Sequence, residues 1–184
     1  AGLYRGGCGI KKVYRFLADG RITYQDDRYH TYPYGVGGGK PGASSKKTLI
    51  RANGETVELP SKVRDVPVYA GDRLIFETAG AGGVGDPLER DPELVAKDVR
   101  WNLVSREAAR RDYGVVLKDD GSVDAAATEA ERAKIRATRG PLPEFDHGDL
   151  PPLEELSRIV AATRRSFNEW LSQELGKARV NGAS

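Results

Sequence analysis

The sequence predicts an α+β protein, in which a glycine-rich antiparallel β part over about residues 1–88 is followed by helices. Three observations lead to this prediction. Glycine accounts for 22 of the 184 residues and is concentrated before residue 90. Short extended runs alternate with turn residues over the same part, and good helix-start signals appear only after Asp86-Pro87.

The β part contains two hairpin signals, Asp19-Gly20 and Asn53-Gly54, each flanked by extended runs. Such pairs are typical of the tight turn that joins two antiparallel strands. We therefore expect the strands on either side of each pair to form a hairpin. The expected strands cover residues 10–17, 21–24, 48–51, 55–59, 66–69 and 73–78.

Helices are expected beyond residue 90, because the sequence there carries start and stop signals. Asp91 is a good N-cap with Pro92 in the first turn, and Ser105 begins a second helix that ends at Gly114. The alanine-rich, highly charged segment 125–139 is expected to form an exposed helix.

The C-terminal part consists of a Pro/Gly/Asp linker, residues 140–152, and an amphipathic helix, residues 153–176. A single stripe at spacings of three and four residues predicts that this helix docks on a partner surface. The stripe contains Leu153, Leu156, Val160, Thr163, Phe167 and Trp170. The polar tail, residues 177–184, is expected to fray.

Composition excludes several classes of protein. The 29 basic and 27 acidic residues nearly balance, which argues against a nucleic-acid partner. No run approaches the roughly 20 apolar residues of a membrane helix, and no leader is recognised. One cysteine, Cys8, rules out an internal disulfide framework and favours a cytoplasmic location. With two histidines besides, a Cys/His zinc site is excluded within the chain.

Two glycine motifs resemble nucleotide-binding sequences. Residues 80–85 match G-x-G-x-x-G after an expected strand, but Asp86-Pro87 follows and the helix begins only at Pro92. A sharp glycine loop packed against another backbone is therefore the favoured interpretation. Gly39-Lys40 is not a P-loop, because the remaining positions of that motif do not match.

Three residues carry reactive or metal-binding side chains. His30 lies near Asp26 and Asp27, which could complete a metal site, although a solvated turn is favoured. His147 lies in the linker, and Cys8 has no recognisable base beside it. No metal ligand is assigned.

Four segments, taken in order, resemble the C-terminal third of the hydantoinase B / N-methylhydantoinase / 5-oxoprolinase family. This family also contains the large subunits of acetone and acetophenone carboxylases. The four segments are Tyr4–Gly9, Tyr32–Gly42, Leu59–Lys62 and Ala70–Pro92, and Asp98-Val99 and Tyr113–Leu117 fit as well. The resemblance covers residues 1–120. It implies that these residues are the C-terminal segment of a B-type domain, followed by an exposed helix and linker over 121–152 and the docking helix 153–176.

The resemblance implies a subunit or fragment of an ATP-dependent hydantoinase or oxoprolinase complex that hydrolyses a cyclic amide. A subunit of an ATP-dependent ketone carboxylase and a non-catalytic assembly module are the alternatives. The implied partners are the remainder of the B-type subunit and a hydantoinase A-like subunit that holds ATP and Mg. No cofactor is expected in this chain, any metal is expected in the N-terminal portion of B-type subunits that it lacks, and the chain is expected to be inert alone.

Ten residues form the candidate site. Lys62, Asp72, Asp86 and Arg90 are the catalytic candidates, and Gly38, Gly39, Lys40, Gly82, Gly83 and Gly85 are the candidate loops for substrate or an intermediate. In one interpretation, loop amides and nearby cations hold an anionic intermediate. In the other, which is favoured because no general base is evident, glycine permits tight turns and subunit contacts.

Overall fold

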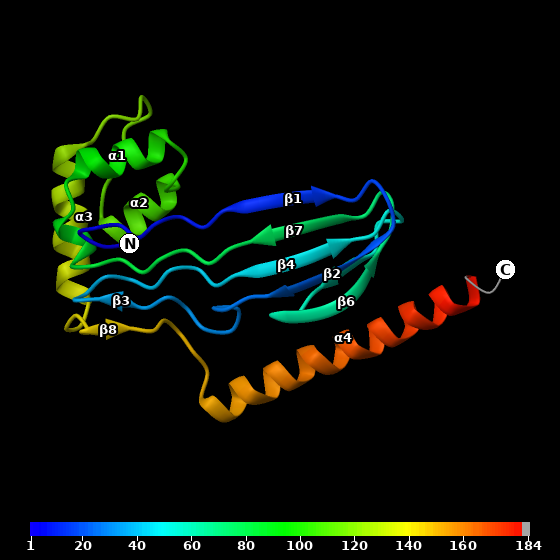
Figure 1. The fold of residues 1–184 in the computed structure, drawn as a ribbon. Coiled ribbons are helices and arrows are strands. Elements are labelled where there is room, and N and C mark those ends of the chain that lie inside the picture. The colour runs from blue at the N-terminus through cyan, green and yellow to red at the C-terminus, as the bar shows by residue number, and fades with distance from the viewer. Residues whose placement is uncertain (182–184) are drawn as a thin grey trace. The chain divides into compact units, whose positions relative to one another are not determined.

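The computed structural model describes residues 1–181, with side chains through residue 176, and divides the chain into two compact units (Figure 1). Residues 1–8, 32–43 and 80–148 make up the first, here called the glycine unit. Residues 9–31, 44–79 and the chain from 149 onward make up the second, the sandwich unit. Fraying was expected for residues 177–184; residues 177–181 are described as part of a helix, and residues 182–184 lie outside the described residues.

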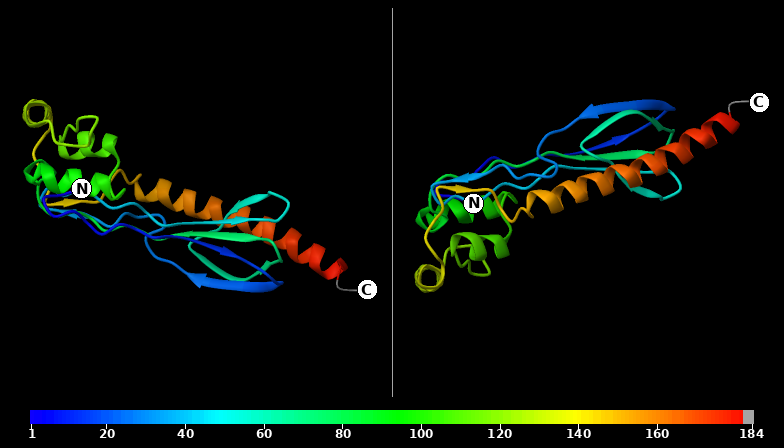
Figure 2. Two further views of the ribbon diagram at one scale, coloured as in Figure 1. Left: turned by 90° about the horizontal axis from the view of Figure 1, so that it is seen from above. Right: turned by 90° about the horizontal axis from the view of Figure 1, so that it is seen from below.

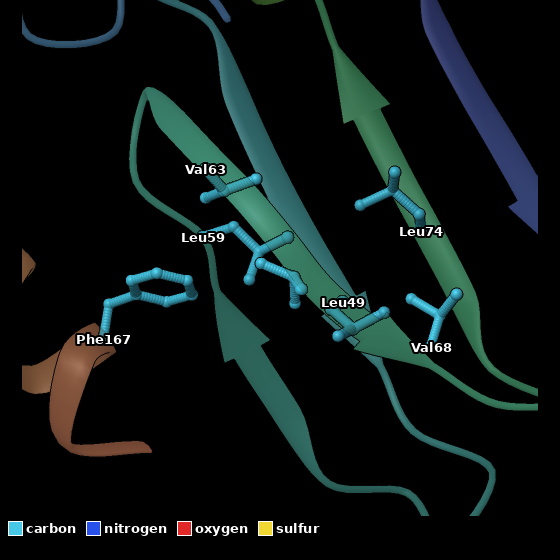
Figure 3. Close-up of a cluster of buried hydrophobic side chains, with 7 residues drawn as sticks. Leu49, Leu59, Val63, Val68, Leu74 and Phe167 are labelled. Atoms are coloured by element: carbon cyan, nitrogen blue, oxygen red, sulfur yellow. The ribbon is translucent and has the colours of Figure 1, made fainter. Parts of the chain in front are cut away.

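The sandwich unit contains two antiparallel sheets (Figure 1). Four strands form one sheet, in the order β1 (Lys11–Arg15), β7 (Arg73–Glu77), β4 (Lys46–Ile50) and β5 (Thr56–Glu58). The other sheet pairs β2 (Gly20–Gln25) with β6 (Lys62–Val68). One apolar cluster draws side chains from both sheets, including Leu49, Val68 and Leu74, so the inner faces of the sheets share a core (Figure 3).

The long helix α4 (Leu153–Asn181) completes the core of the sandwich unit. Its Phe167 points into the apolar cluster and is only 7% exposed (Figure 3). Trp170 packs against the same cluster, whereas Leu153 at the start of the helix is 79% exposed. The later part of the expected apolar stripe therefore packs on the chain's own strands, whereas Leu153 at its beginning is exposed to solvent.

The expected hairpin at Asp19-Gly20 is wrong. β1 pairs with β7, and β2 pairs with β6, so the strands on either side of this turn belong to different sheets. Phe16, which follows β1, and Ile22 and Tyr24 of β2 pack against the same core from different sheets. The second expected hairpin is confirmed, because β4 pairs with β5 around Asn53-Gly54.

The glycine unit consists of a short β pair and helices (Figure 2). β3 (Gly35–Val36) pairs with β8 (Phe145–Asp146), a strand that lies inside the expected linker. The helical elements are η1 (Pro87–Glu89), α1 (Pro92–Arg100), α2 (Arg106–Tyr113) and α3 (Ala125–Thr138). Val95, Ala109, Tyr113 and Val115 form their core.

The predicted helix signals are confirmed in this unit. The Asp91 side chain accepts a hydrogen bond from the amide of Glu93 at 2.9 Å, and that of Ser105 accepts one from Ala108 at 3.1 Å. Gly114 ends α2 in the left-handed conformation, with φ of 62°. The α+β prediction is thus confirmed. None of the helices within residues 1–181 combines the length and apolarity that crossing a bilayer requires.

Candidate functional site

The ten candidate residues fall in both units. Lys62 and Asp72 belong to the sandwich unit, and the other eight belong to the glycine unit. The structure brings the two candidate glycine clusters together, and each unit is described in turn.

The glycine clusters touch through their backbones. A Cβ atom added to Gly39 would lie 2.1 Å from the carbonyl oxygen of Gly83, and one added to Gly82 would lie 1.8 Å from that of Tyr34. A Cβ atom on Gly83 would lie 1.9 Å from the carbonyl oxygen of Ala1. Only glycine allows backbones to approach this closely. The 80–85 motif is therefore packed against other backbone, and the next α-helix begins at Pro92.

The amides of these clusters donate to carbonyl oxygens within the unit. Gly83 N donates to Lys40 O at 2.9 Å, and Gly85 N donates to Val36 O at 2.9 Å. Gly37 and Gly38 donate to Glu144 and Pro143, at 2.7 and 2.9 Å. An anion held by these four amides would have to displace those bonds. The geometry favours the packing interpretation, and a direct role in binding stays a prediction.

Asp86 is held by an ion pair with Arg139 and by its position as the N-cap of η1. It caps η1 by accepting from the amide of Leu88 at 2.9 Å, and Arg139 Nη1 donates to it at 2.7 Å. The second nitrogen of the Arg139 fork bonds the other carboxylate oxygen. The hydrogen bonds from Arg139 lower the pKa of Asp86, although burial acts the other way. An ionised carboxylate with both oxygens occupied is a poor general base.

Arg90 belongs to a cluster that the sequence did not reveal. Its Nη2 lies 3.1 Å from Asp98 Oδ2, and Arg5 Nε lies 3.0 Å from the same oxygen. Arg90 also donates to the carbonyl oxygen of Leu3 at 3.0 Å, and Arg5 reaches the sulfur of Cys8 at 3.2 Å. Two guanidinium groups thus share one largely buried carboxylate, which leaves the cluster with an excess of positive charge.

The sequence contains only a weak signal by which this cluster could have been found. Arg5 and Asp98 both lie in segments that resemble the family, but 93 residues separate them and no spacing rule joins them. The nearby phenol of Tyr113 is buried, and burial raises its pKa to about 12, so it remains protonated near neutral pH.

Lys40 lies in a separate ion pair of the glycine unit. Its Nζ is 3.0 Å from Asp112 Oδ1, and Arg111 binds the other oxygen of that carboxylate at 2.7 Å. Burial raises the pKa of Asp112, but the hydrogen bonds from Arg111 and Lys40 outweigh it, so the net shift is downward. Lys40 is itself about half exposed, so its charge remains accessible to solvent.

In the sandwich unit, Asp72 is buried and fully engaged. It accepts from Arg51 Nη1 at 2.7 Å and from the amides of Ala52 and Tyr69 at 2.9 Å each. Arg51 Nη2 in turn donates to Glu174 of α4 at 2.8 Å. This cluster ties α4 to the sheet, and a catalytic role for Asp72 would require breaking it. Lys62 is exposed at the beginning of β6.

Neither histidine belongs to a metal site among the described residues. His30 stacks edge-on against Tyr29, with ring centroids 4.8 Å apart, and His147 lies 5.7 Å from the ring of Tyr34. Burial lowers the pKa of His30, against the opposing charge of Glu58. Within the described residues, no group of three His, Cys, Asp or Glu side chains could hold a metal ion.

Comparison with known proteins assigns the first part of the chain to a family. Residues 1–87 match the model of the hydantoinase B/oxoprolinase family. An uncharacterized protein of Methanocaldococcus jannaschii is 38% identical over 125 residues, which are 67% of this chain and 22% of that protein. The B-type subunit of a putative D-/L-hydantoinase from Pseudomonas sp. is 34% identical over 132 residues, covering 71% of this chain and 22% of that protein.

Two solved structures share the fold. The ATP-dependent caprolactamase of Pseudomonas jessenii matches with a TM-score of 0.55 and 30% identity, over 72% of this chain and 24% of that one. A nucleotide-free acetone carboxylase matches with a TM-score of 0.62 and 24% identity, over 76% of this chain and 24% of that one. The chain thus spans less than a quarter of the length of the relatives that it matches.

Proposed function

Through residues 1–87 this chain belongs to the hydantoinase B/oxoprolinase family, and from that premise we propose that it forms part of an ATP-dependent complex that hydrolyses a cyclic amide. The observation that carries the proposal is the 30% identity and shared fold with an ATP-dependent caprolactamase, together with the similarity to the B-type subunit of a hydantoinase. Hydantoins and caprolactam are both cyclic amides, which defines the substrate class.

ATP and Mg belong, in this proposal, to a hydantoinase A-like partner subunit. The glycine motifs of this chain support that assignment, because Gly83 and Gly85 use their amides to bind neighbouring backbone. Any metal of the complex lies in the part of a B-type subunit that this chain does not span, and a cytoplasmic location is part of the same proposal. The chain alone is expected to be inert.

In this complex the glycine unit contributes a rigid scaffold that carries a cluster of positive charge. Its backbone contacts fix the clusters containing Gly39 and Gly83, and the Arg5–Asp98–Arg90 cluster carries a net positive charge beside them. A positive edge would favour an activated, anionic substrate at a subunit interface. The contribution proposed for Arg90 and Lys40 is positioning of such an anion.

A ketone carboxylase is the second candidate, favoured by the fold shared with acetone carboxylase. The two are separated by reconstituting the A-type subunit, the remaining B-type polypeptide and this chain, then measuring ADP release with hydantoin, oxoproline, caprolactam or an aryl ketone. Ring-opened product without bicarbonate supports the hydrolase. ADP release and product formation that require both a ketone and bicarbonate support the carboxylase and overturn the hydrolase.

A non-catalytic assembly role is tested with Lys40→Ala, whose side chain is about half exposed, and with Lys134→Ala on the exposed face of α3 as its control. If the complex assembles with both variants but Lys40→Ala alone lowers turnover at least tenfold, the glycine unit takes part in the reaction. If turnover is unchanged in both, the assembly role replaces the proposed one.

A further inference from the structure

The two sides of the sandwich unit differ in what lies over the core. Along β5 and β6, α4 packs on the core through Phe167 and Trp170, and a pocket of about 460 Å³ remains between β5 and α4. Along β1 and β2, a groove of about 370 Å³ opens between the two sheets. Apolar and aromatic side chains line most of it: Tyr14, Phe16, Ile22, Tyr24, Leu74 and Phe76.

Strand β1 presents an unused backbone edge beside this groove. Within the described residues β1 pairs with β7 alone. Phe16 N donates to Asp72 O at 2.9 Å, and Ile10 O accepts from Thr78 N at 3.0 Å, so even-numbered residues bond β7. Because backbone groups alternate along an antiparallel strand, those of Lys11, Val13 and Arg15 point away from the sheet.

The exposure of β1 agrees with a surface that receives another strand. All five of its residues are exposed, with Val13 at 57% and Tyr14 at 47%. An exposed edge with apolar side chains is a template for strand addition unless charge blocks it. The charged residues of β1 are all basic: Lys11, Lys12 and Arg15. They therefore disfavour a basic incoming strand and favour an acidic one.

The basic charge argues against a second copy of this chain. Antiparallel pairing of two β1 strands about Val13 would place Lys11 of one opposite Arg15 of the other, and like charges directly opposite are destabilising. A strand with acidic residues would instead gain cross-strand ion pairs with the same side chains.

We propose that an extended segment of the remaining B-type polypeptide adds to β1 as a strand, with apolar side chains in the groove beside Tyr14 and acidic side chains beside Lys11 and Arg15. The length of the relatives supports this occupant, since this chain spans 22% of the B-type subunit of a hydantoinase and 24% of a caprolactamase chain. The inference rests on the proposed function only for the identity of the partner polypeptide.

A photo-crosslinking amino acid at Val13, in the full chain assembled with its complex, tests the occupant. The expected crosslink maps to an acidic, alternately apolar segment of the B-type polypeptide. The same probe at Thr56, on the opposite edge strand β5, is the matched control and is expected to give no such crosslink. A Val13 crosslink to another copy of this chain or to the A-type subunit overturns the proposal, as does the absence of any crosslink.

Val13→Pro tests strand addition itself. The substitution removes an amide that points away from β7, so the existing ladder stays intact. Binding of the B-type polypeptide to the chain should weaken at least tenfold, whereas Thr56→Pro, whose amide likewise points outward on β5, should leave it unchanged. Equal binding by both variants overturns the proposal, and circular dichroism checks that both fold.

Charge selection is tested with Lys11→Glu and Arg15→Glu together, which should weaken the same binding at least tenfold. The ion pair that Lys11 makes with Glu77 is exposed, so its loss should leave the fold intact. Unchanged binding would refute the acidic strand. All of these readouts measure binding, so they are independent of turnover. A complex that assembles through β1 but shows no ATP-coupled hydrolysis contradicts the proposed function and leaves this inference standing.

Discussion

Replacing Gly39 with alanine is expected to destabilise the chain strongly, whereas the same change at Gly7 is expected to have little effect. The new Cβ atom at Gly39 would lie 2.1 Å from Gly83 O and 2.3 Å from Gly83 C, far inside the 3.4 Å of ordinary contact. At Gly7, no atom lies within 4 Å of the added Cβ. The two glycines therefore form a matched pair.

The expected cost follows from what has to move. Relieving the clash at Gly39 displaces Gly83, whose carbonyl oxygen accepts from Val36 N at 3.0 Å. Overpacking costs about 1–3 kcal/mol and a strained backbone hydrogen bond about 1 kcal/mol, so the substitution should cost about 3 kcal/mol. For a chain of this size that lowers Tm by about 6–12 °C. Gly7→Ala should stay within about 0.5 kcal/mol.

Thermal and urea unfolding, followed by circular dichroism, measure both variants beside the unmodified chain. The reasoning is refuted if Gly39→Ala and Gly7→Ala unfold at the same temperature, because then the close backbone approach carries no energetic weight. Loss of folding in Gly39→Ala alone would agree with the reasoning, since Gly7→Ala reports on glycine replacement in general.

Three further predictions concern the ion pairs and the helix. Arg51→Ala should cost about 3–5 kcal/mol in urea unfolding, because it leaves the buried Asp72 and Glu174 carboxylates without their shared cation; a cost below about 1 kcal/mol would contradict this. Phe167→Ala should cost about 3–5 kcal/mol by emptying its place in the core, against less than about 0.5 kcal/mol for Ile159→Ala, which is 43% exposed; equal costs would show that α4 does not depend on Phe167. The lowered pKa of Asp86 means that its ion pair with Arg139 stabilises the fold above the ordinary carboxyl pKa of 3.8 and that this contribution is lost as pH falls through the lower folded pKa. The difference in unfolding free energy between the unmodified chain and Asp86→Asn should accordingly shrink on acidification below about pH 4, and a difference independent of pH would refute it.

The candidate site was predicted only in part. The sequence pointed to the glycine clusters, and the structure brings them together with Lys40, Asp86 and Arg90 in one unit. It did not point to Arg5 and Asp98 as partners of Arg90, because ion pairs between distant segments leave no periodic trace. Whether the clusters bind an intermediate remains a prediction that the reconstituted complex tests.

Local signals in the sequence determined the ends of the helices and one turn. Asp91, Ser105 and Gly114 act within a few residues of themselves, through side-chain caps or a left-handed backbone, so their effect can be predicted without knowing the fold. The hairpin around Asn53-Gly54 was predicted for the same reason.

Only the tertiary structure decided which strands pair and what covers the core. The strands beside Asp19-Gly20 separate into different sheets, because pairing with β7 and β6, together with the packing of Phe16, Ile22 and Tyr24 on one core, outweighs the local turn preference. Arg51 bonds Glu174 across 123 residues of sequence. Phe167 and Trp170 of the apolar stripe on α4 pack against the chain's own strands. Burial and charge pairing between distant segments depend on the whole fold, and no short stretch of sequence contains them.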